Sequence, residues 1–130
     1  SLGLSFNQLT LCGSASWNSS GLTMADRRHL GVYPNQIFID TENMVYATSD
    51  DDDRLSVGQK NVSVSYQKLF NNLNQSKGVF LSEKGEIYID NGAHFGRVEK
   101  WTMNATTPTI VMTVNGSCHS LFLGPDDLLY

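Results

Sequence analysis

Short apolar runs alternate with polar turns along the chain, and one such pattern occurs three times, in the segments 37–46, 79–88 and 121–130. Each copy has an apolar, β-rich run, a polar turn and a second apolar run that ends in tyrosine. The copies are 42 residues apart, with the aromatic pairs Phe38 and Tyr46, Phe80 and Tyr88, and Phe122 and Tyr130. Two apolar runs around a short turn predict a β-hairpin, with turn residues supplied by Asn43, Gly85 and Gly124-Pro125.

Further strand material follows the first two hairpins. The segment Arg54-Leu55-Ser56-Val57 corresponds, at an offset of 43 residues, to Arg97-Val98-Glu99-Lys100-Trp101, and the runs 62–70 and 109–114 follow as fourth strands. Four strands in about 42 residues is the arrangement of one propeller blade. No window has helical periodicity over more than a turn or two. We therefore predict an all-β protein of four-stranded antiparallel propeller blades.

The pattern divides the chain into two complete blades and two partial ones, which together amount to about three blades. The strands of each blade are labelled a to d from the central channel outward. Residues 35–70 and 77–114 are two complete blades, and residues 119–130 are strands a and b of a further blade. Residues 1–30 are expected to supply strands c and d of one blade, because Trp17 lies 84 residues before Trp101 and residues 21–25 resemble 109–113. Typical propellers have about four to eight blades. The chain is thus expected to be a segment of a larger propeller, or one of several copies that assemble into one.

Charge and composition argue against several classes of function. The net charge is −4 and the isoelectric point is about 5.1. This argues against nucleic acid and anionic membranes as partners, because both require clustered Lys and Arg. The apolar runs are too short for a membrane span. Residues 1–10 lack the basic start and apolar block of a signal peptide, so a secreted form would be a processed one.

Five Asn-x-Ser/Thr sequons predict a secreted, extracellular glycoprotein, because this motif is an N-glycosylation acceptor in surface loops. Asn18, Asn61 and Asn104 are spaced by 43 residues and lie in the expected c–d connections. Asn74 and Asn115 lie in the expected d–a connections. Because strands alternate in direction within a blade, glycans would cover both faces of the ring. Two readings stay open: a carbohydrate coat, or sequons copied neutrally by tandem duplication.

Cys12 and Cys118 are the only cysteines. An even number of cysteines in an oxidising compartment suggests a disulfide, so an intrachain Cys12–Cys118 bond is one expectation. The alternatives are two buried thiols, or bonds to partners outside this stretch of chain.

The repeated motif combines Ile/Val/Leu-Phe-Ile/Leu, a spacer and Ile/Val/Leu-Tyr with a later Arg-Leu/Val, and it resembles the NHL-repeat family of β-propellers. The second copy matches best, with Gly78-Val79-Phe80-Leu81, Gly85-Glu86-Ile87-Tyr88-Ile89-Asp90 and Gly96-Arg97-Val98. The chain is similar to secreted NHL-type proteins of small aquatic invertebrates such as rotifers. The resemblance implies a platform for protein, RNA or ligand binding, and in a few relatives lyase or lactonase activity. Two departures are the acidic run before Arg54 and the proline in the third turn.

Two loops at equivalent b–c positions form the candidate ligand face. The run of Asp50, Asp51, Asp52 and Asp53 offers carboxylate ligands for Ca²⁺, but it lacks the spaced pattern of a calcium loop and is more simply a solvated acidic loop. In the second copy, Asp90 and His94 would make an acid–base pair, although Asp-Asn-Gly is also an ordinary turn sequence. The chain contains no catalytic motif and no metal-ligand spacing of His or Cys. No cofactor is expected, with Ca²⁺ as the one alternative.

These features favour a non-enzymatic extracellular glycoprotein that acts as a scaffold or binding module, with protein or glycan partners or copies of itself. One alternative is a propeller hydrolase or lyase with a metal in the channel, which needs inward carboxylates, Asn or His from several inner strands. Only the first copy has an acidic residue, Asp40, directly after its first apolar run. The other alternative is a glycan-binding lectin. Its stacking residues would come from aromatics that otherwise pack between blades: Trp17, Tyr46, Tyr88 and Trp101.

Overall fold

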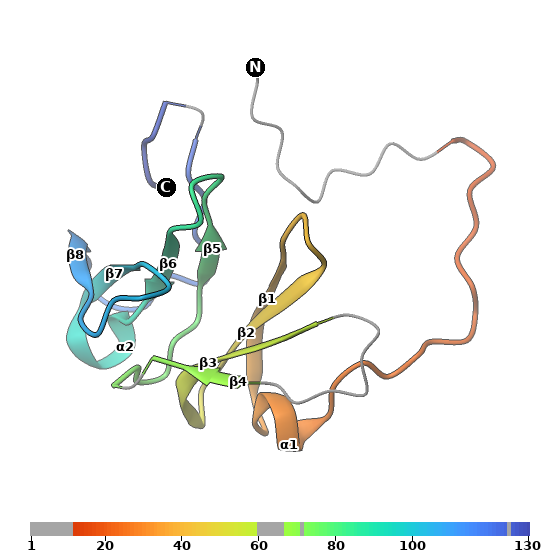
Figure 1. Ribbon diagram of the computed structural model, residues 1–130, viewed down its shortest axis with the longest axis horizontal. Helices are drawn as coiled ribbons and strands as arrows, with labels where there is room; N and C mark the ends of the chain where they lie inside the picture. Colours follow the sequence, from red (N-terminus) through yellow and green to blue (C-terminus); the bar gives the residue numbers. More distant parts are fainter. Residues whose placement is uncertain (1–11, 60–66, 71, 125) are drawn as a thin grey trace.

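The computed structural model describes residues 12–59, 67–70, 72–124 and 126–130 (Figure 1). Within these residues, the strands form two four-stranded antiparallel sheets. The helices of this part are single turns, α1 (Arg27–Leu30) and α2 (Gly92–Phe95). No helix in the described ranges is long and apolar enough to cross a membrane. The prediction of an all-β fold with four-stranded antiparallel sheets is confirmed.

Each sheet is a meander in which consecutive strands are neighbours. The first blade has the order β1-β2-β3-β4, with β1 (Pro34–Ile39), β2 (Met44–Ser49), β3 (Asp52–Gln59) and β4 (Gln67–Leu69). The second blade has the order β5-β6-β7-β8, with β5 (Val79–Leu81), β6 (Ile87–Asp90), β7 (Arg97–Trp101) and β8 (Thr109–Thr113). The two sheets fall on the segments expected for the complete blades, and the arrangement fits an open part of a propeller.

All three repeated hairpins are closed by the same turn. In each copy the last turn residue has a left-handed backbone, at Asn43 (φ 61°), Gly85 (φ 75°) and Asp127 (φ 59°). Its N–H donates to the carbonyl three residues earlier, at 3.1, 3.0 and 3.1 Å respectively. Gly adopts this conformation without steric cost, and Asn and Asp tolerate it better than most residues. In the third turn Gly124 accepts this hydrogen bond, as a residue of the expected turn, and the left-handed residue is Asp127; Pro125 lies outside the described residues.

The third hairpin packs on the second blade. Phe122 and Tyr130 exchange two backbone hydrogen bonds of 3.0 and 2.8 Å, and residues 123 and 129 form an antiparallel bridge. Leu121 is buried in a cluster with Tyr88 and Val98 of the second blade. The described residues of 119–130 thus form a hairpin that contacts the second blade through Leu121.

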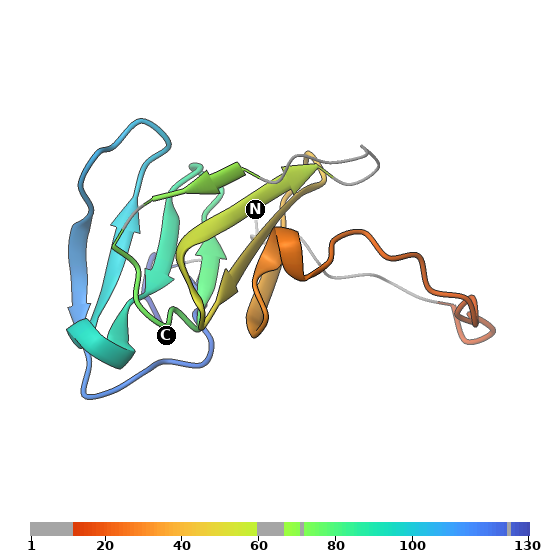
Figure 2. The same cartoon turned by 90° about the horizontal axis from the view of Figure 1, so that it is seen from below.

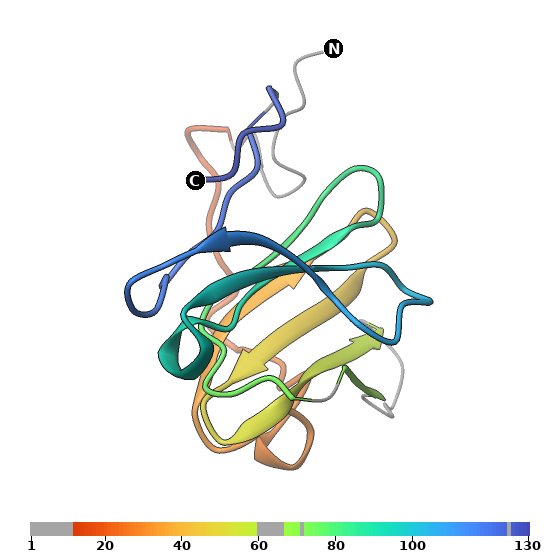
Figure 3. The ribbon, with the colours of Figure 1, turned by 90° about the vertical axis from the view of Figure 1, so that its left-hand side faces the viewer.

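The two sheets pack face to face as successive layers (Figures 2 and 3). Side chains alternate between the faces of a strand, so each strand of the repeat has one face toward the next blade and one toward the preceding blade. Phe38 and Tyr46 point from the first blade toward the second, whereas Val79, Ile87 and Ile89 point back toward the first. All five lie in one buried core, so the repeat pattern decides which side chains meet.

The phenylalanines of the three copies form a regular series, which we call the Phe ladder. The rings of Phe38 and Phe80 lie 5.4 Å apart between centroids with an interplanar angle of 69°. Phe80 and Phe122 repeat this arrangement at 5.7 Å and 68°. Edge-to-face contact is a favoured geometry for aromatic pairs. One packing geometry therefore joins the first blade to the second and the second to the third hairpin.

The c and d strands expected in residues 1–30 are not formed in the described part of that segment. Residues 12–26 contain no strand and extend away from the sheets (Figure 2), and Trp17 and Leu22 are exposed. Two strands alone are marginal in water, so strands c and d need strands a and b of their own blade beside them. The third hairpin, which has no c and d strands among the described residues, lies on the second blade, whereas residues 27–30 pack on the first.

The helix α1 packs on β2 and β3. Asp26 caps it, since its Oδ1 accepts from the N–H of Arg28 at 2.9 Å and its own N–H donates to Nδ1 of His29 at 3.2 Å, which makes a capping box. The strands present small residues there, and the hydroxyl of Ser56 donates to the carbonyl of His29 at 3.0 Å. The helix thus covers part of the face that a preceding blade would cover.

We predict that the stability of the fold depends strongly on Ile89, which is fully buried in the core between the blades. We expect Ile89→Ala to lower the free energy of unfolding by about 2–5 kcal/mol, because it removes buried methyl groups and leaves a cavity. The control Ile110→Ala changes an exposed residue of β8 and should cost less than about 0.5 kcal/mol. Urea unfolding followed by fluorescence measures both; equal effects would contradict a core between the two sheets.

Candidate functional site

The acidic run predicted as a ligand loop lies at the turn between β2 and β3, but it is shorter than expected. Asp50 and Asp51 form the turn, whereas Asp52 and Asp53 belong to β3, where Asp52 pairs with Ser49. The prediction of a four-residue acidic loop is therefore wrong, because the pairing between the two strands continues up to the residues beside the turn.

Asp51 fastens the segment before β1 to this turn. Its carboxylate accepts hydrogen bonds from the hydroxyl of Ser49, from the N–H of Val32 at 2.8 Å and from the N–H of Tyr33 at 3.2 Å. These donors, first the Ser49 hydroxyl and then the Val32 N–H, lower the pKa of Asp51 from 3.8 to about 2. The carboxylate therefore holds the chain in place.

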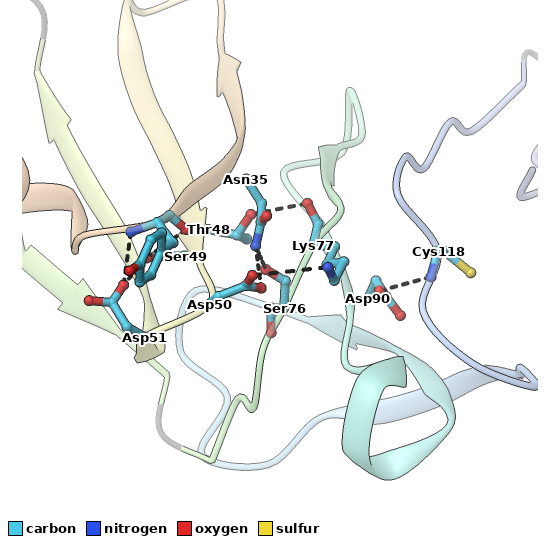
Figure 4. Close-up of polar contacts among 10 residues, drawn as sticks. Asn35, Thr48, Ser49, Asp50, Asp51, Ser76, Lys77, Asp90 and Cys118 are labelled. Carbon is cyan, nitrogen blue, oxygen red and sulfur yellow. Dashed lines mark hydrogen bonds and ion pairs between the residues drawn. The ribbon is translucent and has the colours of Figure 1, made fainter.

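Further polar groups join the first blade to the linker that leads into β5. We call Asn35, Asp50, Ser76 and Lys77 the rim cluster (Figure 4). Nδ2 of Asn35 donates to Oδ1 of Asp50 at 2.7 Å and to the carbonyl of Ser76 at 3.2 Å. Nζ of Lys77 lies 4.0 Å from Oδ2 of Asp50. The cluster thus ties the β2–β3 turn and β1 to the start of the second blade.

Thr48 and Asp90 occupy equivalent repeat positions, and each binds the linker that follows its blade (Figure 4). The hydroxyl of Thr48 donates to the carbonyl of Lys77 at 3.2 Å. The carboxylate of Asp90 accepts from the N–H of Cys118 at 2.9 Å and from that of Gly92 at 2.8 Å. Asp90 is fully buried, and this burial raises its pKa despite the two backbone donors. Both blades are thus connected to the linker that follows, but Thr48 donates the hydrogen bond whereas Asp90 accepts it.

The structure does not bring His94 and Asp90 together as an acid–base pair. Both oxygens of the Asp90 carboxylate accept backbone N–H groups. His94 is exposed on α2, and its ring packs edge to face on Phe95 with centroids 4.8 Å apart. The helical turn at 92–95 separates the two groups, because it carries His94 to the surface while Asp90 stays inside.

No group of three or more His, Cys, Asp or Glu that could hold a metal ion occurs among the described residues. The carboxylates of Asp50 and Asp51 instead accept hydrogen bonds from side chains and backbone of their own blade. This is the arrangement of a structural turn, in which both carboxylates bind groups of the neighbouring chain.

The sequence analysis did not single out a buried acidic residue on β7. Glu99 is almost fully buried. Its Oε1 accepts from Nε of Arg97 at 2.6 Å and from Nδ2 of Asn91 at 3.1 Å, and its Oε2 accepts from Nε1 of Trp101 at 3.1 Å. These donors offset the cost of burying the carboxylate. The period-two spacing of Arg97, Glu99 and Trp101 places them on one face of the strand and is the signal that could have revealed them.

A pocket of about 390 Å³ lies beside this ion pair, and its lining includes Phe70, Arg97, Trp101 and Thr106. Phe70 stacks on Trp101 with ring centroids 4.2 Å apart. The Trp101 side chain is therefore covered and only 4 % exposed. Thr106 is the third residue of the sequon at Asn104, so the pocket lies next to this sequon.

The described sequon asparagines lie in connections between strands or in the N-terminal segment; Asn61 lies outside the described residues. Asn104 lies between β7 and β8, Asn74 between β4 and β5, and Asn115 after β8. Asn18, Asn104 and Asn115 are exposed, and Asn74 is partly exposed. Because β7 and β8 are antiparallel, Asn104 and Asn115 lie at opposite ends of the second blade.

The expected disulfide between the two cysteines is not formed, and both are free thiols. Cys12 is exposed in the N-terminal segment beside the hydroxyl of Ser14, which lowers the pKa of the thiol. Cys118 is partly buried near Asp90, and this burial, followed by the Asp90 charge, raises its pKa. The bond is absent because residues 12–26 extend away from the blades, while Cys118 lies on the linker after the second one.

The fold and these contacts define an open, propeller-like all-β module in which most of the polar groups on the predicted ligand face connect one blade to the next. Comparison of the chain with models of protein families gives no match, and comparison with curated proteins gives none either. Function is therefore inferred from the residues and their geometry.

The Asp51 hydrogen bonds predict an acid-sensitive contribution to stability. A lowered pKa means that this contribution is present above the ordinary value of 3.8 and is lost as the pH falls toward about 2. We expect Asp51→Asn to lower the thermal midpoint at pH 7 and to reduce the loss of stability between pH 4 and about 2. Thermal melts across this range measure both; parallel curves for the variant and the parent would contradict the assignment.

The equivalent positions of Thr48 and Asp90 allow a matched comparison. Asp90→Ala leaves two N–H groups without their acceptor and should cost about 2–4 kcal/mol of unfolding free energy. Thr48→Ala removes one donor to a carbonyl and should cost about 1 kcal/mol. Chemical denaturation measures both free energies, and an equal or smaller loss for Asp90→Ala would contradict its role as the stronger connection.

Proposed function

We propose that this chain is a segment of a secreted, N-glycosylated propeller of the NHL type that acts as an extracellular scaffold or binding module. Its supports are the repeat pattern, the five sequons and an exposed apolar residue on one face of the first blade.

One comparison between equivalent positions supports the proposal most directly. Ile37, Val79 and Leu121 occupy the same place in the three copies. Val79 and Leu121 are 0 % and 4 % exposed, because each packs on a preceding blade, whereas Ile37 is 58 % exposed. A large apolar residue at a position that is otherwise buried marks a surface suited to a further protein layer. A chain whose blade faces take up partners is a module for assembly or binding.

The sequon positions support the same function. Asn104 lies at one end of the second blade and Asn115 at the other, so that sugars there would extend from the blade ends. The flat sides of the sheets, where Ile37 and the third hairpin are exposed, carry none of the described sequon asparagines. Glycans placed in this way would protect and solubilise the ends and leave the sides free for protein contact.

The two alternatives have weaker support. A hydrolase or lyase with a channel metal needs carboxylates, Asn or His from several inner strands, and of these β1 and β5 carry only Asn35, which donates to Asp50 and Ser76. A lectin is supported by the pocket beside Glu99, but the Trp101 ring there is stacked on Phe70 and offers little face for a sugar. The scaffold or binding role therefore remains the better supported one.

Expression through a eukaryotic secretory pathway tests the proposal. We expect a secreted product whose mass falls to the polypeptide value of 14.4 kDa after enzymatic removal of N-glycans, with at least three of the five sequons occupied. Asn104→Gln should remove one glycan and no other, which glycopeptide mass spectrometry measures. A secreted chain with bare asparagines would contradict the glycoprotein assignment.

A further inference from the structure

We infer that the sequon at Asn74 is a glycosylation site that the fold closes. It accepts a glycan only until the linker 72–78 packs between the two blades, whereas the sequon at Asn18 stays open in the folded chain. This inference rests on the proposed function, in which the sequons carry N-glycans. It adds that one of these sites is modified before the second blade folds.

The first support is the burial of the third residue of this sequon. The motif requires a hydroxyl at that position as well as the asparagine, so the transferring enzyme must reach both groups. Asn74 is partly exposed, but Ser76 is only 1 % exposed. In the sequon at Asn18, which also ends in serine, both Asn18 and Ser20 are exposed. The fold therefore withdraws one of the two required groups at Asn74 and leaves both accessible at Asn18.

The linker that contains Asn74 is fastened to both blades. On the side of the first blade, Nδ2 of Asn35 donates to the carbonyl of Ser76 at 3.2 Å (Figure 4). On the side of the second blade, the N–H of Asn74 donates to Oδ1 of Asn91 at 2.9 Å. Leu73, the residue before the sequon, is buried in the core between the blades. The burial of the sequon thus requires both blades.

The order of synthesis leaves an interval in which this sequon is open. Asn91 follows Asn74 by 17 residues, and the core residues Ile87 and Ile89 also come after the linker. At a synthesis rate of about 5–20 residues per second, the chain needs about 1–3 s to reach Asn91 after Asn74. Until then, neither the acceptor for the Asn74 N–H nor the core strand is present to hold the linker. Glycan transfer and packing therefore compete for the same segment.

The second support is the hydroxyl of Ser76, which has no hydrogen-bond partner within the part of the chain that the structure describes. A buried hydroxyl without a partner lowers the stability of a fold, so the folded chain gains nothing from this group. The sequon does use it, because serine is one of the two residues that the motif accepts at its third position. A role before packing therefore accounts for a hydroxyl that the fold leaves unpaired.

The transfer needs a sugar donor of the lipid-linked oligosaccharide pyrophosphate class. A bond forms between Nδ2 of Asn74 and the anomeric carbon of the first sugar, and the bond from that carbon to the phosphate oxygen breaks. The lipid pyrophosphate leaves with the electron pair of that bond, and the amide nitrogen loses one proton to the solvent. Because the Asn74 side chain is partly exposed in the folded chain, a glycan attached earlier extends into the solvent while the linker packs.

Glycan transfer in vitro tests the closure. The full chain, made without glycans in bacteria, is incubated in its folded state with purified oligosaccharyltransferase and a lipid-linked oligosaccharide, and glycopeptide mass spectrometry measures each site. We expect at least tenfold less transfer to Asn74 than to Asn18 or to the exposed sequon at Asn104. The double variant Ile87→Asp, Ile89→Asp places two charges in the core and should unfold the chain, which loss of the cooperative thermal transition confirms. Transfer to Asn74 should then come within twofold of transfer to Asn18. Equal transfer to these two sites in the folded chain would overturn the proposal, and so would a bare Asn74 in the unfolded variant.

A matched pair of variants tests the role of the Ser76 hydroxyl. Ser76→Ala removes a hydroxyl without a described partner, so the urea midpoint of the unglycosylated chain should stay unchanged or rise. The control Thr48→Ala removes a hydroxyl that binds the same linker and should lower the midpoint. An equal fall for both variants would overturn the assignment of the Ser76 hydroxyl to glycan transfer. Because these measurements use the purified chain, their failure is distinct from a failure of the proposed function, which the mass of the secreted chain decides.

Discussion

The packing of one blade on the next is the interaction on which the other features of this structure depend. Each sheet is thin and has two faces, and neither face is stable in water while its large apolar side chains are uncovered. Phe38, Phe80 and the aliphatic side chains of β5 and β6 cover one another between the two sheets. The third hairpin then repeats that contact through Phe122. The fold is a stack whose internal interface recurs at a fixed step in the sequence.

Polar contacts at the ends of the strands hold each blade to the linker that leads to the next one. Thr48 and Asp90 bind the linkers that leave their blades, and Asn35 and Asp50 bind the first of these linkers again. These groups lie on the predicted ligand face, but most of their hydrogen bonds are made to other parts of the same chain. The sides of the blades are therefore the better candidate for a binding surface.

The blade sides are unequal in a way that suits association. The second blade packs on the first blade and on the third hairpin, while Ile37 of the first blade and Tyr130 of the third hairpin are exposed. On the proposed function, sequons at the blade ends would carry carbohydrate, and exposed apolar residues on the sides would contact protein. An extracellular scaffold built from repeats would use both, because each blade gains stability only from a neighbour.

The sequence by itself predicted two four-stranded blades, because apolar residues alternate along the strands and the hairpins recur every 42 residues. This pattern matches the order of β1 to β8. The sequence also predicted that Tyr46, Tyr88 and Trp101 are packed between blades, but the same prediction is wrong for Trp17, which is 80 % exposed. It did not determine that Asp52 would join a strand, that Asp127 would close the third turn, or that residues 12–26 would lack strands. Those features depend on which other segments are present to pair with them. Only the tertiary structure showed that Glu99 pairs with Arg97 and that His94 is exposed while Asp90 is buried, because burial and partners are properties of the folded chain.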